Sequence, residues 1–470
     1  MKRIRFLAWP LLALALVGAV FLYFHNRAPT VLFNRVVLEG LTAARDSERL
    51  YKMQVPAGAR DLQFSVFGGD NGNAIDIYAG FGEPPSTSSF DARNLAGGDA
   101  RMIAFSAPQA GTWYLLVRGA RGAYMDASLV ASYSMPGEIF KVGMHAHRLY
   151  NGGDSDGAAS AEPQFGYGLI RDWDISHLQD AVVWRPDGSI DFSLIDRVYA
   201  GHARHGAKVI KTFGTVPTWV SKRPDEPNRQ YPNWPGAKSG PRDLDLYEDY
   251  VYRFVSHTRK SLWAVEGWNE PYACPDDAEA EFTTMSPTEL ADVQKRVYRA
   301  TKRVDPNILV FSPPQGYVCG IPTILDARTS QNEPMSQFFD ALAWHAYNRS
   351  AQASAGQSYA MEIHRVRQYL AQAGLAQMPI VDTEHGWLPP PKEGGREFRE
   401  LSDAQKGRVL QETAQLAKSL GLLAIVWYGY DDEFIGMPMK SPVISASLQE
   451  SYRQLDASQS GAGRTGTAKQ

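Results

Sequence analysis

Eight short apolar runs, separated by segments with helical periodicity, occupy residues 137–455 of this 470-residue chain. The runs lie at about residues 140–145, 168–172, 208–213, 262–268, 308–312, 340–345, 379–384 and 422–428. Residues 286–289 (Ser-Pro-Thr-Glu) form a capping box with proline at the first helical position, and a helix that begins at Ser402 should end at Gly421. A strand followed by a helix, repeated eight times, predicts a (β/α)8 TIM barrel. The weakest repeat is the first, because residues 148–166 are rich in Gly, Ala and Ser and show no clear helix.

Residues 31–135 follow another pattern, in which short alternating runs are separated by turn-forming residues. Alternation is clearest at residues 62–67, 74–78 and 112–117, and the intervening segments are rich in Gly, Pro, Asn and Asp. Such runs without helical periodicity predict an all-β sandwich of about 100 residues.

The sandwich segment is similar to the bacterial pre-peptidase C-terminal (PPC) domain in residues 76–78, 90–94 and 108–114. In that family such modules are accessory, and some bind calcium or matrix polymers. Four side chains here have suitable oxygens, Asp70, Asn71, Asn73 and Asp76. A polar turn is the simpler interpretation of them, because the same residue types form tight turns.

The first 30 residues carry a targeting signal. Lys2, Arg3 and Arg5 precede an apolar stretch at residues 6–24, which at about 1.5 Å per residue comes close to spanning a bilayer. Residues 17–19 (Val-Gly-Ala) resemble a cleavage site, but apolar residues continue beyond them, so we favour an uncleaved signal anchor over a cleaved signal peptide. Both alternatives place the folded part outside the cytoplasm, either anchored in the bacterial inner membrane and facing the periplasm or secreted.

Composition limits the remaining possibilities. The formal net charge of -3, without a cluster of Lys or Arg, argues against nucleic acid as a partner. Residues 456–470 are rich in Ser, Gly, Ala and Thr and predict a disordered tail. The chain contains only two cysteines, Cys274 and Cys319, and each follows a predicted strand. In an extracytoplasmic protein they predict one disulfide between neighbouring loops, and the alternative is two unrelated thiols.

Two glutamates follow apolar runs in the predicted barrel. Glu270 lies in residues 266–271 (Glu-Gly-Trp-Asn-Glu-Pro) after the fourth run, and Glu384 lies in residues 381–387 (Val-Asp-Thr-Glu-His-Gly-Trp) at the end of the seventh. Catalytic groups of such barrels lie at the rim where the strands end, so we expect both carboxylates there. A pair of carboxylates, one protonated and one ionised, is what cleavage of a glycosidic bond requires. Either glutamate taken alone has a simpler interpretation, a solvated charge at a strand end.

With Asn-Glu-Pro after the fourth strand and a glutamate ending the seventh, residues 138–455 resemble the clan A glycoside hydrolases. Within that clan they most resemble glycoside hydrolase family 39, especially bacterial members associated with biofilm exopolysaccharides. The resemblance implies that Glu270 is the acid/base and Glu384 the nucleophile of a retaining reaction. It further implies that Asn269 meets the sugar 2-hydroxyl and that Tyr347, after the sixth strand, hydrogen-bonds the nucleophile. No metal or organic cofactor is expected.

Position in the predicted strands adds supporting residues. Arg171, at the end of the second strand, is expected to hold the nucleophile charged and oriented, or else to pair with a neighbouring aspartate. His345 and Tyr347 share one face of the sixth strand, either at the site or as a core pair. Glu266 should also face inward, where a buried carboxylate needs a cation such as Lys211 or Arg171.

Aromatic and histidine side chains gather near the same strand ends. The candidates for stacking on sugar rings are Trp173, Trp219, Trp387 and Trp427, and the alternative for each is packing in the core. The histidines His145, His147, His345 and His385 match no zinc spacing, so sugar hydrogen bonding or a structural role is expected rather than a metal site. No Gly-x-Ser-x-Gly segment occurs, which argues against a serine hydrolase of the α/β type.

These observations predict a retaining β-glycoside hydrolase that cleaves within an exopolysaccharide chain, at the inner membrane or outside the cell, with the sandwich as an accessory module. The bacterial export machinery for such a polymer is a further candidate partner. An exo-acting β-xylosidase-like enzyme or a plant-polysaccharide glycanase is the alternative within the same class. A non-catalytic polysaccharide-binding or export scaffold is the alternative from another class.

Overall fold

A computed structural model describes residues 28–67, 75–95, 100–135, 138–145, 168–173, 180, 183–228, 232–272, 282–348, 355–387, 402–428 and 441–455. The chain divides into two compact units, Met1–Pro136 and Gly137–Gln470. No helix within the described ranges is long and apolar enough to cross a membrane. The predicted membrane segment at residues 6–24 and the predicted tail at 456–470 lie outside them.

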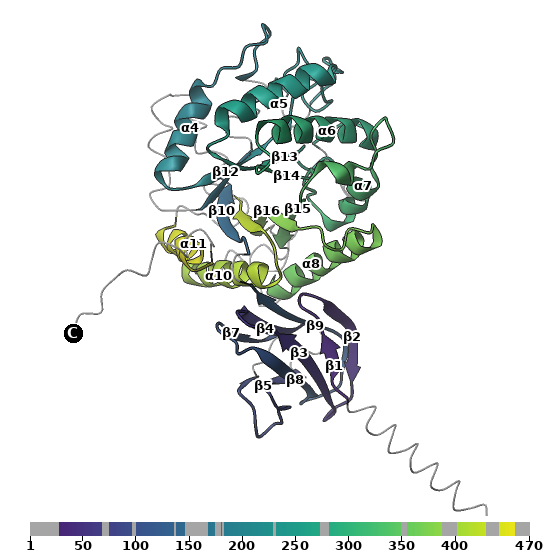
Figure 1. Ribbon diagram of the computed structural model, residues 1–470, viewed down its shortest axis with the longest axis vertical. Helices are drawn as coiled ribbons and strands as arrows, with labels where there is room; N and C mark the ends of the chain where they lie inside the picture. The colour runs from purple at the N-terminus through teal and green to yellow at the C-terminus, as the bar shows by residue number, and fades with distance from the viewer. Residues whose placement is uncertain are drawn as a thin grey trace, which may run out of the picture. The chain divides into compact units, whose positions relative to one another are not determined.

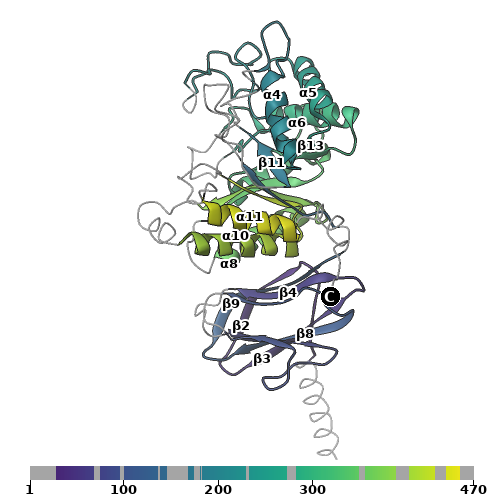
Figure 2. The same cartoon turned by 90° about the vertical axis from the view of Figure 1, so that its left-hand side faces the viewer.

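The first unit is the predicted β-sandwich, made of two sheets (Figure 2). Its strands are β1 (Thr30–Leu32), β2 (Val37–Ala43), β3 (Glu48–Val55), β4 (Arg60–Phe67), β5 (Ile75–Phe81), β6 (Ala92–Asn94), β7 (Ala100–Phe105), β8 (Gly111–Gly119) and β9 (Tyr124–Ser134). One sheet has the order β1-β3-β8-β5-β6 and the other β2-β9-β4-β7. Alternate residues such as Phe64 of β4 and Leu115 of β8 are buried between them, as the period of two predicts.

Of the predicted calcium ligands, Asp70, Asn71 and Asn73 lie outside the described residues. Asp76 lies in β5, is 7% exposed, and has its Oδ1 3.8 Å from the Arg121 guanidinium. The calcium hypothesis therefore stays a prediction.

The described residues of the second unit form a sheet of eight parallel strands, and every predicted strand is present. They are β10 (Lys141–His145), β11 (Leu169–Asp172), β12 (Lys208–Thr212), β13 (Leu262–Glu266), β14 (Leu309–Phe311), β15 (Leu342–Asn348), β16 (Ile380–Trp387) and β17 (Ala424–Trp427). Their order is β14-β13-β12-β11-β10-β17-β16-β15. The two ends of this order are joined by parallel bridges from Phe311 to Ala341 and from Gln315 to Trp344. The sheet is therefore closed, and the predicted barrel is confirmed.

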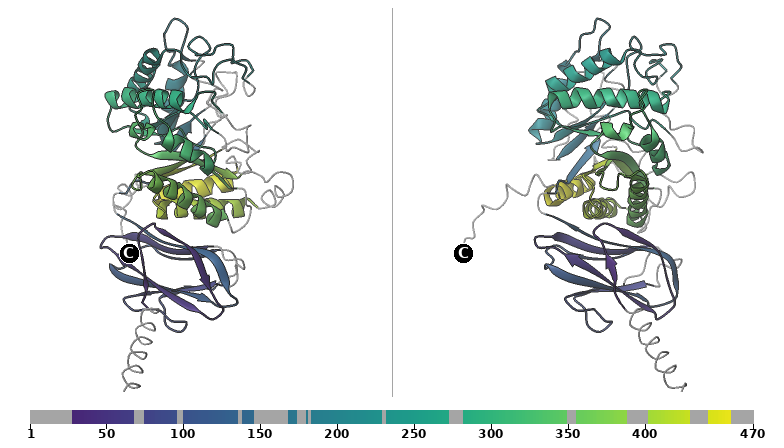
Figure 3. Two further views of the ribbon diagram at one scale, coloured as in Figure 1. Left: turned by 90° about the vertical axis from the view of Figure 1, so that its right-hand side faces the viewer. Right: turned by 45° about the vertical axis from the view of Figure 1, so that its right-hand side comes forward.

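Helices surround this sheet (Figures 1 and 3). They are α4 (Ser193–Arg204), α5 (Leu244–Thr258), α6 (Pro287–Val304), α7 (Ile321–Asp326), α8 (Ala355–Gln372), α10 (Asp403–Ser419) and α11 (Pro442–Leu455), with 3-10 turns η1 (Val318–Gly320) and η2 (Met335–Phe338). The capping box predicted at Ser286 begins α6, and Ser402 caps α10 in the same way. Gly421 follows α10 with a φ of 77°, a conformation that favours glycine after a helix. The weak first repeat, residues 148–166, lies outside the described residues.

The predicted disulfide is described at one end only. Cys319, in η1, is disulfide-bonded rather than a free thiol. Cys274, the other cysteine of the chain, lies outside the described residues, so its pairing with Cys319 stays a prediction.

Candidate active site

The side chains inside the barrel change from apolar to polar over two residues along the strands. The apolar layer consists of Leu169, Ile210, Ala264, Phe311, Ala341, Ala343, Val381, Ala424 and Val426. Two residues further along four of the strands lie Arg171, Thr212, Glu266 and His345, all at most 1% exposed. Because side chains alternate along a strand, these four point to the same interior at the C-terminal rim. The rim on which the sequence placed the catalytic residues is therefore lined by charged and polar groups.

Arg171 is the centre of this polar layer. Its Nε donates to Glu266 Oε2 at 2.6 Å, one Nη to Glu384 Oε1 at 2.5 Å, and the other to Asn269 Oδ1 at 2.7 Å. Thr212 donates to the same Glu266 oxygen at 2.7 Å. The cation that Glu266 requires is therefore Arg171. Lys211 instead lies 3.2 Å from Asp180, away from Glu266.

We expect Arg171→Met to lower the free energy of unfolding of the barrel by about 3–5 kcal/mol, since it leaves two buried carboxylates without their shared cation. The loss should shrink as the pH falls, because unpaired buried carboxylates bind protons. Urea unfolding at pH 7 and at pH 5 measures both effects. The control is Arg185→Met, which breaks the exposed pair with Asp191 and should change stability by less than about 1 kcal/mol. Equal losses in the two variants would contradict the role given to Arg171.

Glu384 is 5% exposed and surrounded by donors. Besides Arg171, the Tyr347 hydroxyl donates to Oε2 at 2.6 Å, and His145 Nδ1 lies 3.4 Å from Oε1. Burial alone would raise the pKa of Glu384, but the positive charges of His345 and Arg171 outweigh it and hold that pKa well below its ordinary value. The carboxylate is ionised at neutral pH, as a nucleophile must be.

Glu270 occupies a different environment. Its side chain is 16% exposed, and its Oε1 accepts a hydrogen bond from His345 Nδ1 at 2.6 Å. The backbone of Glu270 has a φ of 37°, in the left-handed region that non-glycine residues rarely adopt. A Cβ placed on Gly316 would lie 2.7 Å from Glu270 Oε1, so the carboxyl group packs directly against that glycine. A strained backbone, a histidine and a glycine together fix its direction.

Gly316→Ala should displace the Glu270 carboxyl group while the protein still folds, because the obstructing atoms are the end of a side chain. Displacement of a catalytic group by about 1 Å can cost about 100-fold in rate, so we expect kcat to fall by roughly 10–100-fold. Substrates with poor leaving groups should lose most, since they depend on protonation. Gly320→Ala is the control, because its Cβ would meet the Gln315 side chain instead. If kcat of the Gly316 variant equals that of wild type on such substrates, the contact does not position Glu270.

His345 links the two glutamates, since its Nδ1 also lies 3.3 Å from Glu384 Oε2. Burial lowers the pKa of His345. The charge of Glu384, together with the hydrogen bond and charge of Glu270, raises this pKa by more than burial lowers it, so it lies above its ordinary value. The histidine cation is therefore favoured by folding. Stability from this source is fully present below pH 6.5 and is lost as the pH rises through the raised pKa.

We accordingly expect the free energy of unfolding to decline as the pH rises from 6 to 9, and His345→Gln to remove part of that slope. Urea unfolding across this range is the measurement. Identical slopes for wild type and His345→Gln would show that His345 does not titrate in this way.

One donor atom from each of Glu270, His345 and Glu384 lies within 4.8 Å of the other two. Such a group has the size of a metal site, but its electrostatics disfavour a cation. The guanidinium of Arg171 is bonded to Glu384 Oε1, where it would repel a second positive charge. One carboxyl oxygen of Glu270 therefore lies within 4.8 Å of one carboxyl oxygen of Glu384.

The predicted aromatic residues divide into several cases. Trp173 is buried, and its ring packs on Gly214. Trp219 is half-buried, with its Nε1 bonded to Trp184 O at 3.2 Å. Trp427 is fully buried beside His385, with ring centroids 4.6 Å apart. Since Val426 points into the barrel, Trp427 points outward, which corrects the prediction that it faces substrate. The side chain of Trp387 is outside the described structure.

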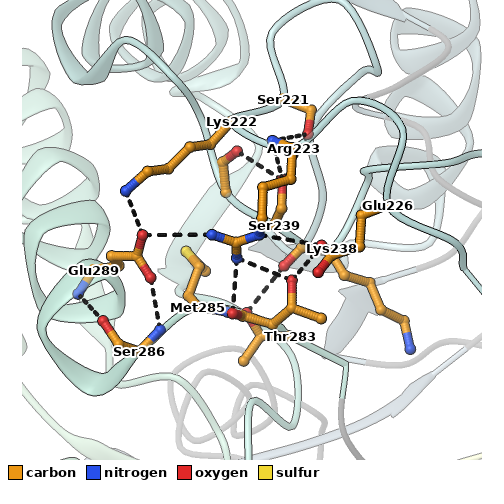
Figure 4. Close-up of polar contacts among 12 residues, drawn as sticks. Ser221, Lys222, Arg223, Glu226, Lys238, Ser239, Thr283, Met285, Ser286 and Glu289 are labelled. Carbon is orange, nitrogen blue, oxygen red and sulfur yellow. Dashed lines mark hydrogen bonds and ion pairs between the residues drawn. The ribbon is translucent and has the colours of Figure 1, made fainter.

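Arg223 lies among polar contacts that tie the loop after β12 to the start of α6 (Figure 4). Its guanidinium donates to Thr284 O at 2.7 Å and lies 3.6 Å from Glu289 and 3.4 Å from Glu226. Lys222 also bonds Glu289. The network therefore fixes a loop that leaves the rim carrying the polar layer.

The structure brings together six of the predicted site residues, namely Arg171, Asn269, Glu270, His345, Tyr347 and Glu384. Sequence reasoning missed the contact of His145 with Glu384, the role of Thr212, and Gly316. The first two could have been found from strand parity, since each stands two residues after an inward position. Gly316 lies in a loop and gave no such signal.

Comparison with known proteins gives two kinds of similarity. The model of the bacterial pre-peptidase C-terminal domain matches residues 47–119, which confirms the resemblance predicted for the sandwich. Xanthomonalisin from Xanthomonas sp. (strain T-22) is 39% identical over 59 residues, which is 13% of this chain and 7% of the relative. The chain thus matches only a small part of that curated protein.

Solved structures similar to the chain include glycoside hydrolases. The GH39 enzyme from Xanthomonas axonopodis pv. citri is 18% identical over 64% of this chain and 63% of its own, with a TM-score of 0.47. A family 39 glycoside hydrolase from Bacteroides cellulosilyticus WH2 is 15% identical over 88% and 83%, with a TM-score of 0.45. A glucosidase from Croceicoccus marinus is 16% identical over 67% and 68%, also with a TM-score of 0.45. Two of these belong to the family that the barrel motifs resemble. At TM-scores below 0.5 they carry no weight for the activity of this chain, which is argued from its own residues.

Proposed function

We propose that the barrel is a retaining β-glycoside hydrolase. The observation that carries the proposal is the pair of carboxyl groups, Glu270 and Glu384, which approach within 4.8 Å in unequal environments. Carboxyl groups about 5–5.5 Å apart are typical of retaining enzymes, whereas inverting enzymes need about 6.5–9.5 Å to admit a water molecule between acid and base.

In the first step Glu384 attacks the anomeric carbon while Glu270 protonates the departing glycosidic oxygen. Glu384 suits the attack because Arg171 and His345 keep it ionised and Tyr347 holds its Oε2. His345 donates to Oε1 of Glu270, which leaves Oε2 as the oxygen that carries the proton. The glycosidic bond breaks, and a covalent bond between sugar and Glu384 forms.

In the second step Glu270, now ionised, removes a proton from a water molecule that attacks the same carbon. The bond to Glu384 breaks, and the carboxylate regains its hydrogen bonds from Arg171 and Tyr347. Two displacements at one carbon give a product with the configuration of the substrate. The protonation state of Glu270 alternates between the steps, and the contact with His345 persists through both.

We propose an exopolysaccharide as the substrate, cleaved within the chain and outside the cytoplasm. The predicted targeting signal at residues 6–24 supports this location, and a PPC-like module is a suitable accessory for gripping a polymer. The disulfide-bonded Cys319 supports an oxidising compartment. Association with the inner membrane or with polymer export machinery belongs to the same proposal.

The deciding experiment incubates the full chain with purified bacterial matrix polysaccharide and, in parallel, with cellulose, mannan and xylan. Release of reducing ends and mass spectrometry of the products identify the sugar, and early oligosaccharides of mixed length indicate cleavage within the chain. Proton NMR of the first product formed should show the β-anomer.

Glu384→Gln provides the control for contaminating hydrolases, since it keeps the size of the side chain. If wild type releases nothing from any polymer, or only as much as the variant, the hydrolase proposal fails. Binding of polymer by both proteins would then favour the non-catalytic scaffold. A first product in the α-configuration would exclude the retaining mechanism.

A further inference from the structure

Strand β16 carries one extra residue immediately before Glu384. Against β15, Asp382 pairs with Trp344 and Glu384 pairs with His345, so Thr383 has no partner. The register against β17 shifts over the same residues, between Asp382 and His385. This is a β-bulge, a feature that redirects side chains and is rare between parallel strands.

The bulge decides which way Glu384 points. Val381 lies in the apolar layer inside the barrel, so regular alternation would turn Thr383 inward and Glu384 outward. The extra residue shifts the alternation by one, and Glu384 points inward beside His345. The proposed nucleophile reaches Arg171 and Tyr347 only because this strand is irregular.

The same shift brings Asp382 and His385 together on the outer side of β16. His385 Nδ1 lies 2.8 Å from Asp382 Oδ2, and Tyr359 of α8 donates to that oxygen at 2.9 Å. The other oxygen, Oδ1, accepts from the backbone N–H of Ala346 in β15 at 3.4 Å. Asp382 and His385 are both 0% exposed. One buried carboxylate thus joins the two ends of the bulge to the neighbouring strand.

Packing also fixes the His385 ring. It lies edge-on to Trp427 of β17 and to Tyr359, with centroid distances of 4.6 and 4.7 Å. Its backbone oxygen accepts from Tyr428 N at 2.8 Å. Because Glu384 is the neighbouring residue in the chain, a fixed His385 restricts the backbone from which the Glu384 side chain starts.

We propose that Asp382 and His385 are positioning residues that hold the β16 bulge and thereby aim Glu384 into the active site. Their pairing fastens the outer side of the strand, so that the inward residue at the bulge is Glu384 rather than Thr383. The role of the pair in catalysis rests on the proposed function, whereas its role in aiming Glu384 does not.

His385→Phe tests the proposal, because it keeps an aromatic ring between Trp427 and Tyr359 but removes the donor to Asp382. We expect kcat to fall by roughly 10–100-fold, the cost of a misplacement of about 1 Å. The acid limb of kcat/KM should also move to higher pH, since a misaimed Glu384 loses the contacts that hold its pKa down. His385→Asn, which restores a side-chain N–H donor near the Nδ1 position, should recover part of both effects.

Tyr359→Phe is the matched control. It removes the other hydrogen bond to the same oxygen of Asp382 but keeps the ring against His385 and the pairing of Asp382 with His385, so kcat should stay within about 3-fold of wild type and the acid limb should not move. The probes are 2,4-dinitrophenyl β-glycosides of glucose, xylose, galactose and mannose, as mono- and disaccharides, together with the polymers of the function assay. If His385→Phe and Tyr359→Phe change kcat equally and neither moves the acid limb, the pair is merely structural and the proposal is overturned.

A crystal structure of His385→Phe shows the direction of the Glu384 side chain without any substrate. We expect the carboxylate to lose Tyr347 or Arg171, which lie at 2.6 and 2.5 Å in wild type. If both contacts remain, the proposal fails whatever the kinetics show. If wild type cleaves no probe while the variant structure shows a displaced Glu384, the proposed function fails and the positioning role stands.

Asp382→Asn gives the same test should His385→Phe not fold. The carboxamide keeps the shape of the side chain but offers one acceptor oxygen to three donors. The expected displacement of Glu384 and the overturning result, two intact contacts, are the same.

Discussion

Glu384→Ala is expected to lower kcat by roughly 10⁴–10⁶-fold, the scale on which loss of a nucleophile acts in covalent catalysis. Arg171 keeps its bonds to Glu266 and Asn269 in this variant, so the barrel should still fold. The shortened side chain leaves space beside the anomeric carbon. Sodium azide should restore part of the activity by attacking that carbon directly, and the product should be the α-glycosyl azide. Aryl β-glycosides of the sugar found in the polymer screen are the substrates.

Glu384→Gln is the companion variant, because its amide fills the space and should prevent rescue by azide. Rescue of Glu384→Ala but not of Glu384→Gln would show that azide acts from the position of the missing carboxylate. Activity above about 1% of wild type in purified Glu384→Ala would contradict the assignment of the nucleophile.

The strand ends could be predicted because the barrel repeats one simple rule. An apolar run that stops at a charged residue marks the rim, and parity along the strand then tells which residues face inward. Arg171, Glu266 and His345 follow from this rule, and the structure places all three in one hydrogen-bonded layer. Sequence could also say that Glu266 needs a cation, although it left Arg171 and Lys211 as equal candidates. Strand parity could have decided between them, because Lys211 lies between the inward positions Ile210 and Thr212, and the structure places it against Asp180.

The rule fails at Glu384, which the structure places at the rim as the sequence predicted, but for whose direction the sequence gave no physical reason. Regular alternation counted from Val381 predicts that Glu384 points outward. The sequence of residues 381–387 contains no pattern that predicts the bulge. Trp427 fails for the opposite reason. A tryptophan at a strand end suggested sugar stacking, yet parity from Val426 places it on the outer side against His385. Strand irregularities and outward positions are decided by neighbouring strands, which a single segment does not contain.

Gly316 illustrates a third kind of limit. Its importance comes from the space it leaves for the carboxyl group of Glu270, a residue 46 positions earlier in the chain. Glycines are common in loops, and the chain has 41 of them. No local pattern separates a glycine that forms a turn from one that makes room for a catalytic group.

Glu270→Ala should produce a loss that depends on the leaving group. For poor leaving groups such as a sugar hydroxyl, we expect kcat/KM to fall by roughly 10²–10⁴-fold, the usual contribution of general acid catalysis. For 2,4-dinitrophenyl glycosides, whose leaving group needs no proton, kcat/KM should stay near wild type. Their kcat should still fall, because no base then activates the water molecule, and hydrolysis of the covalent intermediate on Glu384 becomes slow.

Azide distinguishes the role of Glu270 from that of Glu384 in this experiment. It needs no base, so it should attack the accumulated intermediate from the face that water uses and yield the β-glycosyl azide, opposite in configuration to the product from Glu384→Ala. Glu270→Gln is the control for space, since it should show the same leaving-group dependence with weaker rescue. A loss that is equal for all leaving groups, or an α-azide from the Glu270 variant, would show that Glu270 is not the acid/base. The two product configurations together test the whole arrangement, because they require the carboxyl groups to act on opposite faces of one anomeric carbon.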